Sequence, residues 1–181
     1  MQEMIDIALL VAQRLTSANI PYMISGSVAA SFYAVPRMTN DVDIVVQLYK
    51  KDKEQLLRLF SSDFYISSDS IDDAFAGVGM FNIIHNASVS KCDMILLKDD
   101  AFSRSAFSRS LVIEFEGTPL KVISPEDLII QKLLWKRETG SELQWIDIQR
   151  LIESKKESLD KEYLFQWGRE LGLSNALKEI L

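Results

Sequence analysis

The sequence contains few residues of the kinds that cross-link a chain or bind zinc. Its 181 residues include one cysteine, Cys92, and one histidine, His85. One cysteine excludes a disulfide within the chain, and this pair of side chains excludes a structural zinc site built in this chain alone. We therefore expect the protein to occupy a reducing compartment, the cytoplasm.

Long apolar runs are also missing. The longest, at residues 7–12, has six residues, whereas a membrane-spanning helix needs about 20. The chain begins MQEMID, with acidic residues where an export signal carries positive charge. We expect neither a membrane span nor an export signal.

There is no basic surplus. The chain holds 26 acidic and 20 basic residues, for a formal net charge of −6. Residues 1–120 contain 15 acids and 10 bases, and residues 121–181 contain 11 and 10. This balance argues against nonspecific binding of duplex nucleic acid. It leaves room for a local basic pocket, for which the second region is the better candidate.

With 48% hydrophobic and 25% charged residues, the chain has the composition of a globular protein. Hydrophobic periodicity predicts a mixed first part and a helical second part. We expect strands at 22–25, 42–46, 64–66, 80–85, 91–97, 111–115 and 120–123, and helices at 3–18, 28–34, 51–60, 142–154, 158–171 and 173–180. Residues 67–79 are polar and hold two glycines, so we expect a loop or a helical turn there, and residues 99–109 are ambiguous.

Ser124-Pro125-Glu126-Asp127 is a strong helix start, with a capping serine, proline at the first helical position and acids in the first turn. The chain after this point reads as helical throughout. We predict an α+β fold in which residues 1–123 form a catalytic part, a short mixed sheet with flanking helices. Residues 124–181 form a helical part that completes a cleft.

Two acidic residues alternate with apolar ones where the strand expected at 42–46 begins. Asp41 and Asp43 are two residues apart, so both side chains point to the same face of the strand. Two adjacent carboxylates repel each other and are costly on a buried face unless a cation lies between them. Oxygen-only ligands of this kind suit Mg²⁺ or Mn²⁺. The alternative to a metal site is an ordinary pair of acids on an exposed surface.

A strand, a tight turn and a helix come shortly before these acids. Gly26-Ser27 stands where the helix begins. Glycine lets a phosphate approach the backbone, the start of a helix favours negative charge, and the serine hydroxyl adds a donor. Paired carboxylates beside a phosphate cradle are the groups needed for metal-assisted phosphoryl or nucleotidyl transfer.

A third carboxylate, Asp93, lies in the middle of an apolar strand. We expect it to join Asp41 and Asp43, because a lone acid there needs a partner. Its neighbour Cys92 points to the opposite face of a regular strand, where it would be a small core residue.

Taken together, Gly26-Ser27, thirteen intervening residues, Asp41-Val42-Asp43 and the later Asp93 resemble the pattern of the nucleotidyltransferase superfamily, which includes DNA polymerase β-like and minimal nucleotidyltransferases. Arg37-Met38-Thr39 before the acids resembles the bacterial branch that contains abortive-infection type II toxin nucleotidyltransferases. That branch often has a serine-proline-acid helix start, a lysine on that helix and an aspartate one helix later.

Lys132 and Asp147 fit the last two places in that pattern. The resemblance implies transfer of a nucleoside monophosphate from an NTP to an acceptor, with release of pyrophosphate. It also implies that Asp41 and Asp43 hold two Mg²⁺ ions and that Asp93 completes one metal site and helps deprotonate the acceptor. Nucleotide binding falls to Gly26, Ser27, Arg37, Thr39, Lys132 and Asp147.

Each of these residues has a plainer interpretation. Arg37 can be a surface cation, Thr39 a turn cap, Lys132 a buried stem with its ammonium group in solvent, and Asp147 a solvated helical acid. We expect His85 to be structural or exposed. Three tryptophans, Trp135, Trp145 and Trp167, are expected to pack within the helical part.

The acceptor stays open between RNA or tRNA, a protein and a small molecule. Three functions fit: a nucleotidyltransferase that could be the toxin of a toxin–antitoxin pair with an antitoxin partner, a transferase that modifies small molecules such as antibiotics, and a non-catalytic binding or regulatory module of the same fold. The intact set of three carboxylates argues against the last.

Overall fold

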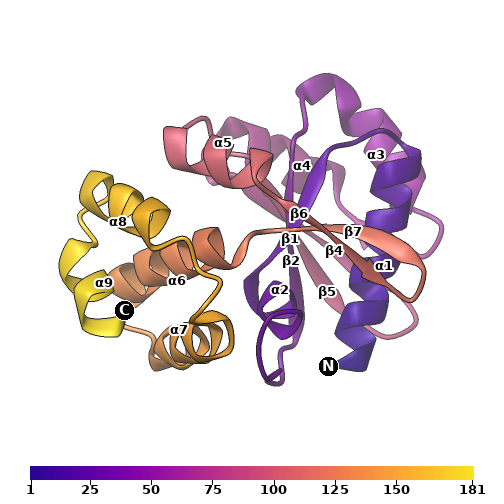
Figure 1. Ribbon diagram of the computed structural model, residues 1–181. Coiled ribbons are helices and arrows are strands. Elements are labelled where there is room, and N and C mark those ends of the chain that lie inside the picture. Colours follow the sequence, from indigo (N-terminus) through magenta and orange to yellow (C-terminus); the bar gives the residue numbers. More distant parts are fainter.

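The computed structural model describes residues 1–181, and a mixed seven-stranded sheet forms its centre (Figure 1). The strand order is β3-β4-β5-β2-β1-β7-β6. β2 pairs in parallel with β5, and β1 in parallel with β7, whereas β1 and β2 are antiparallel. The strands are β1 (Tyr22–Ser25), β2 (Asp41–Val46), β3 (Phe64–Ile66), β4 (Met80–His85), β5 (Lys91–Leu96), β6 (Leu111–Phe115) and β7 (Thr118–Val122).

Helices cover the sheet on both sides. In Figure 1, α1 and α3 lie on one side and α6 to α9 on the other. None of the helices combines the length and the apolar character needed to cross a membrane. The helices are α1 (Gln2–Ser17), α2 (Gly26–Ser31), α3 (Lys53–Phe60), α4 (Ser68–Asp73), α5 (Ala101–Ser108), α6 (Pro125–Thr139), α7 (Glu142–Lys155), α8 (Lys161–Glu170) and α9 (Ser174–Ile180), with shorter turns η1 (Lys50–Asp52) and η2 (Ala74–Val78).

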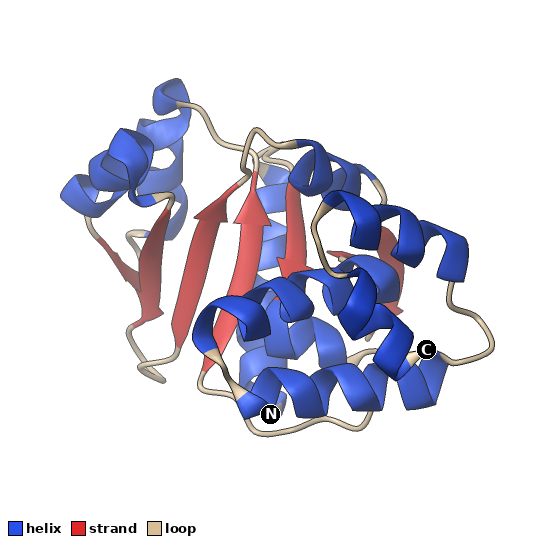
Figure 2. Ribbon diagram, turned by 90° about the vertical axis from the view of Figure 1, so that its left-hand side faces the viewer, coloured by secondary structure: helices blue, strands red, loops and turns tan.

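The buried core follows from the spacing of apolar residues along the helices and along the strands. On α1 the buried side chains recur every three or four residues, as in Met4, Ile7, Val11 and Leu15. The central strands β1, β2 and β5 lie between other strands and carry mostly buried residues. Figure 2 shows the sheet face with the C-terminal helices in front of it. The catalytic candidates therefore lie on a sheet face that helices partly cover.

The predicted α+β fold is confirmed, and most elements lie within about three residues of their expected bounds. Residues 67–79 and 99–109 contain further elements. One is α5, which Asp100 caps by accepting a hydrogen bond from the Ser103 amide at 2.7 Å. The other holds α4, η2 and two glycines with positive φ, Gly77 and Gly79. The division at residue 123 stays a prediction about domains. In the structure α6 begins at Pro125, directly after β7.

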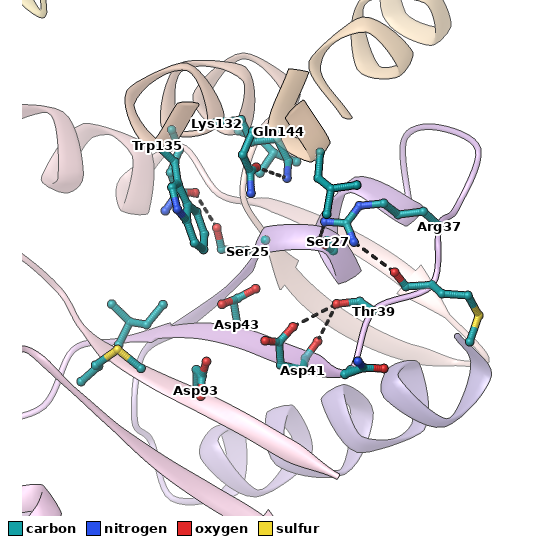
Figure 3. A pocket seen from close by; sticks show the side chains of 18 residues that line it. Ser25, Ser27, Arg37, Thr39, Asp41, Asp43, Asp93, Lys132, Trp135 and Gln144 are labelled. Atoms are coloured by element: carbon teal, nitrogen blue, oxygen red, sulfur yellow. Dashed lines mark hydrogen bonds between the residues drawn. The ribbon is translucent and has the colours of Figure 1, made fainter. Parts of the chain in front are cut away.

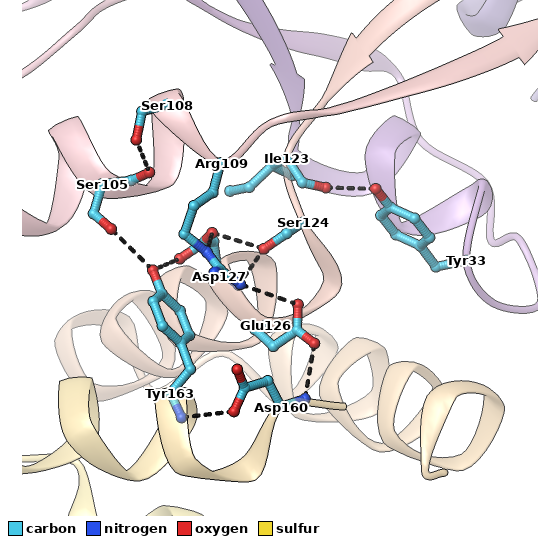
Figure 4. Close-up of polar contacts among 10 residues, drawn as sticks. All are labelled: Tyr33, Ser105, Ser108, Arg109, Ile123, Ser124, Glu126, Asp127, Asp160 and Tyr163. Carbon is cyan, nitrogen blue, oxygen red and sulfur yellow. Dashed lines mark hydrogen bonds and ion pairs between the residues drawn. The ribbon is translucent and has the colours of Figure 1, made fainter. Parts of the chain in front are cut away.

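A buried polar cluster fixes the start of α6 (Figure 4). Ser124 caps the helix by accepting from the Asp127 amide, as its sequence predicts. The fully buried Asp127 carboxylate accepts from Ser124 Oγ at 2.7 Å and from Tyr163 OH on α8 at 2.6 Å. Arg109 lies over the Tyr163 ring at 3.7 Å and pairs with Asp127. The cluster joins α5, α6 and α8, so it ties the start of α6 to both neighbouring helices.

Candidate active site

One cavity contains most of the predicted site residues (Figure 3). Its volume is about 600 Å³, and it lies between the sheet face formed by β1, β2 and β5 and the helices α6 and α7. The predicted residues that line it are the three acids Asp41, Asp43 and Asp93, together with Gly26, Ser27, Arg37, Thr39 and Lys132. Asp147 does not line the cavity, but its carboxylate accepts hydrogen bonds from the lining residues Arg37 and Lys132.

Strand pairing aligns the polar side chains in a row. Ser25 of β1 is the register partner of Asp43 on β2, and Asp43 is the partner of Asp93 on β5. We call Ser25, Asp43 and Asp93 the acid row, after its two carboxylates. Because β2 and β5 are adjacent and parallel, fifty residues of sequence separate two side chains that are neighbours in space. The strand pattern predicts this placement of Asp93 only once the pairing is known.

The Asp43 side chain is the electrostatic centre of the row. Burial, followed by the negative charges of Asp41 and Asp93, raises the pKa of Asp43 to about 6, against the opposing effects of Lys132 and Lys91. No other side chain donates a hydrogen bond to its carboxylate, which faces the cavity (Figure 3). A cation bound here would relieve both the desolvation and the repulsion.

Gly26 lies directly against Asp43. Its φ is +62°, a left-handed conformation that glycine adopts without strain. A Cβ built at this position would lie 1.8 Å from Asp43 Oδ2 and 2.9 Å from its Cβ. Only glycine therefore allows the turn between β1 and α2 to pass the carboxylate so closely.

Asp41 occupies the mouth of the cavity. Thr39 Oγ1 donates to Asp41 Oδ1 at 2.9 Å, so Thr39 orients this carboxylate rather than simply capping a turn. The Asp41 side chain is 41% exposed. On the neighbouring strand its register partner is Lys91, whose ammonium lies 3.8 Å from Asp41 Oδ2.

Two residues that sequence reasoning missed hold Asp93. Asn82 of β4 donates to Asp93 Oδ1, and Lys91 donates to Asp93 Oδ2 at 3.0 Å. The hydrogen bond to Asp93 is the main reason that the pKa of Lys91 is raised. Lys91 is two residues before Asp93 on one strand face, so its spacing was an available signal. The importance of Asn82 depends on the pairing of β4 with β5.

The ligand atoms that these side chains offer are of the chemical type that a hard divalent cation prefers. They are carboxylate oxygens, which suit Mg²⁺ and Mn²⁺, and the raised pKa of Asp43 marks a place where positive charge is favourable. With the side chains as they stand, no three acidic, histidine or cysteine residues converge closely enough to enclose one ion. The ammonium group of Lys91 lies between Asp41 and Asp93.

Arg37 connects Gly26-Ser27, which the sequence predicts to bind phosphate and which we call the phosphate turn, to the helical part. It donates from Nη2 to Ser27 Oγ at 2.6 Å and from Nε to Asp147 Oδ1 at 2.9 Å. Ser27 is in the first turn of α2, and Asp147 is on α7. Arg37 is therefore held by a carboxylate at the edge of the cavity, and it is not a free surface cation.

Lys132 is 2% exposed, so its ammonium group is not in solvent. It donates to Gln144 Oε1 at 3.0 Å and to Asp147 Oδ2 at 2.8 Å. Burial lowers the pKa of Lys132, and the hydrogen bond to Asp147 opposes this shift. Asp147 is buried rather than solvated, and its carboxylate accepts from both Arg37 and Lys132.

The remaining expectations have mixed outcomes. Cys92 is fully buried on the opposite face from Asp93, as predicted, and burial raises its pKa. His85 is partly buried and hydrogen-bonded to Ser88, in keeping with a structural role. The expectation for Trp135 is wrong, because its side chain is 47% exposed and lines the cavity. Trp167 is buried, and its ring packs against Tyr163 within the helical part, as predicted, and also against Phe102 of α5.

Comparison with known proteins identifies the fold. No protein-family model matches the chain, and no curated protein matches it in sequence. An antigenic nucleotidyltransferase-like protein from Paracoccidioides brasiliensis superposes with a TM-score of 0.59 at 21% identity, over 98% of this chain and 93% of that one. ANT(2'')-Ia in complex with adenylyl-2''-tobramycin gives 0.59 at 14% identity, over 99% and 98%.

A third structure, the lincosamide antibiotic adenylyltransferase LnuA bound to lincomycin, gives a TM-score of 0.50 at 11% identity over 78% of this chain and 91% of that one. The chain therefore has the fold of the nucleotidyltransferase superfamily, as the motif resemblance predicted. At these identities the similarity establishes the fold alone.

Proposed function

We propose that the protein is a nucleotidyltransferase that moves a nucleoside monophosphate from an NTP to an acceptor hydroxyl. The observation that carries this proposal is the Asp43 carboxylate, which lies against Gly26 between two further acids. A cavity of about 600 Å³ with two cationic side chains at its edge opens over it. Acids and cations in one cavity suit a substrate whose negative charge requires both a metal and protein cations.

In this proposal the chain's own residues orient the substrate. Arg37, Lys132 and Ser27 hold the β- and γ-phosphates beside Gly26, and Asp41 and Asp43 would hold Mg²⁺ or Mn²⁺. When bound, the metal would neutralise charge on the transferring phosphate and on the leaving pyrophosphate. Thr39 fixes Asp41, and Asp147 fixes both cationic side chains, so Thr39 and Asp147 are positioning residues.

The proposed transfer is a single displacement at the α-phosphorus. The acceptor oxygen forms a bond to the α-phosphorus while the bond from that phosphorus to the bridging oxygen breaks. The electron pair of the broken bond leaves with pyrophosphate, and Asp93 takes the acceptor proton. Asp93 suits this role because Asn82 and Lys91 hold its carboxylate in place beside Asp43.

The test is incubation of the purified protein with Mg²⁺ and each α-labelled NTP, together with pooled tRNA, protein or hydroxyl-bearing small molecules. Label that enters an acceptor in the wild type but not in Asp43→Asn supports the proposal. NTP binding without transfer to any acceptor would instead favour a binding module of the same fold.

We place the protein in the cytoplasm, because its one cysteine is a buried free thiol that suits a reducing compartment. A toxin–antitoxin role predicts that expression of the wild type stops cell growth, that Asp43→Asn relieves this arrest, and that a neighbouring gene encodes a neutralising partner. Growth unaffected by the active enzyme would exclude that role.

A further inference from the structure

A second cavity of about 420 Å³ adjoins the candidate active site. The two cavities share Ile95, Gln131 and Trp135 in their linings. The second differs in character, because 11 of its 16 lining residues are hydrophobic, against 6 of 18 in the first. Nothing in the proposed roles of the phosphate-binding residues accounts for this apolar extension.

The floor of the second cavity continues the sheet face of the acid row. Met23 of β1 pairs with Val45 of β2, and Val45 pairs with Ile95 of β5. These three residues, which we call the apolar row, are each two positions from the corresponding member of the acid row, so they share its face. Phe102 of α5 and Leu134 of α6 also line the cavity.

The two rows have a definite order along the strands. β1 runs from Met23 through Ser25 into Gly26, so the apolar row and the phosphate turn lie on opposite sides of the acid row. In nucleotidyl transfer the attacking and leaving oxygens are roughly in line through the phosphorus. If pyrophosphate departs on the side of Gly26 and Arg37, the acceptor hydroxyl must approach from the side of the apolar row.

We propose that the second cavity is the acceptor site and that it takes a small, largely apolar molecule bearing a hydroxyl group. This inference rests on the proposed nucleotidyl transfer and names its substrate class. The cavity volume is in the range that holds drug-sized ligands, and an apolar lining with a few polar groups is typical of such sites.

The polar groups of the lining argue against a polynucleotide acceptor. Lys98 is the one cationic residue among the 16, beside the acidic Asp100 and Glu138. A strand of RNA needs a row of cations along its phosphates. Gln131 Oε1 already accepts from Ser25 Oγ at 2.6 Å, and Asp100 caps α5, so few groups remain to read the edge of a base.

A binding experiment tests the site directly. The probe is 2-(2-naphthyl)ethanol, an apolar bicyclic molecule with one hydroxyl, and the readout is the NMR shift of the Ile95 and Leu134 methyl groups. Ala106, which is buried on α5, lines the cavity, so Ala106→Leu fills it. Ala101→Leu makes the same change at an exposed position of the same helix.

We expect the wild type and Ala101→Leu to bind the probe and Ala106→Leu to bind it at least tenfold more weakly, with NTP binding retained in all three. Absence of shifts at Ile95 and Leu134, or equal binding by Ala106→Leu, overturns the inference. If Ala106→Leu does not fold, Leu134→Phe fills the cavity from α6 and replaces it in the comparison, with the Ile95 methyl groups as the readout.

Transfer assays separate this inference from the proposed function. The wild type is given labelled NTP with a set of lipophilic alcohols and amino alcohols, a set of sugars and aminosugars, or pooled tRNA. Label in the lipophilic set, reduced at least tenfold in Ala106→Leu, supports the acceptor site. Label only in tRNA or only in the sugars keeps nucleotidyl transfer but overturns the acceptor class. Probe binding with no transfer to any acceptor overturns the proposed function and the acceptor role together, and leaves the cavity as a binding site.

Discussion

Lys132 Nζ donates a hydrogen bond to Asp147 Oδ2 at 2.8 Å, and both side chains are about 3% exposed. The same carboxylate accepts from Arg37 at 2.9 Å. One buried acid on α7 therefore fixes a cation on α6 and another on the segment before β2. The contact couples the helical part to the phosphate turn, because Arg37 also binds Ser27.

Asp147→Ala removes the shared anion and leaves the Lys132 and Arg37 cations near each other without their common counter-charge. Breaking a buried ion pair in this way costs about 3 kcal/mol or more, so we expect a fall of that size in the free energy of unfolding, measured with urea. Glu142→Ala is the control. Glu142 pairs with Lys136 between the same two helices, but its side chain is 78% exposed, and we expect a change below about 1 kcal/mol. Equal losses in the two variants would contradict a special role for Asp147.

Lys132→Ala tests whether the helical part contributes to NTP binding. We expect kcat/KM to fall at least tenfold, a loss of ~1.4 kcal/mol or more in transition-state stabilisation. Lys136→Ala, one helical turn further on, removes a lysine that pairs with Glu142 outside the cavity, and it serves as the control. The melting temperature is recorded for both variants. An unchanged kcat/KM in a folded Lys132→Ala protein would confine this lysine to a structural ion pair.

Local sequence patterns predicted the part of the site that a single strand–turn–helix passage builds. Gly26, Asp41 and Asp43 are close in sequence, and the alternation of β2 alone places both acids on one face. The same local reasoning found the cap at Ser124. These features need no knowledge of how distant segments pair.

The residues that were missed depend on long-range pairing. Asn82 matters because β4 pairs with β5, and Gln144 because α7 docks against α6. Trp135 belongs to the apolar pattern of α6. That pattern does not reveal that its side chain faces the cavity and stays partly exposed. The burial of the Lys132 ammonium could not be predicted either, because its two partners come from the next helix.

Lys91→Met tests whether the Lys91 ammonium competes with a metal for the acids. It lies 3.0 Å from Asp93 Oδ2 and 3.8 Å from Asp41 Oδ2. Removing this positive charge increases the local negative potential, so we expect Mn²⁺ to bind several-fold more tightly in calorimetry without NTP. Lys121→Met, an exposed change on β7, controls for net charge. Weaker Mn²⁺ binding by Lys91→Met would show instead that Lys91 holds the acids in a metal-ready arrangement.

Gly26→Ala should disturb Asp43 as well as the backbone. An alanine with φ near +62° costs about 1–2 kcal/mol, and its Cβ would collide with the Asp43 carboxylate. We expect a loss of about 2 kcal/mol or more in the free energy of unfolding and loss of nucleotidyl transfer. Gly117→Ala has a similar φ of +76° but no atom within 4 Å of the added Cβ. It should show the backbone strain alone and keep its activity. Full activity of Gly26→Ala would remove the requirement for this close approach.

Asp43→Asn should abolish transfer and stabilise the metal-free protein in a pH-dependent way. The folded-state pKa of Asp43 is raised to about 6 from an ordinary 3.8. Between these values the folded protein binds more protons than the unfolded chain, so the stability falls as the pH rises through this window and the penalty is complete above pH 6. Asparagine keeps the shape without the charge. We therefore expect Asp43→Asn to raise the free energy of unfolding by an amount on the order of 1 kcal/mol at pH 7.5, and the gain to disappear near pH 4. Urea unfolding of both proteins at the two pH values, with EDTA present, measures this difference. A variant that is less stable than the wild type at pH 7.5, or one that still transfers nucleotide, would show that Asp43 is not the strained, metal-binding acid of this site.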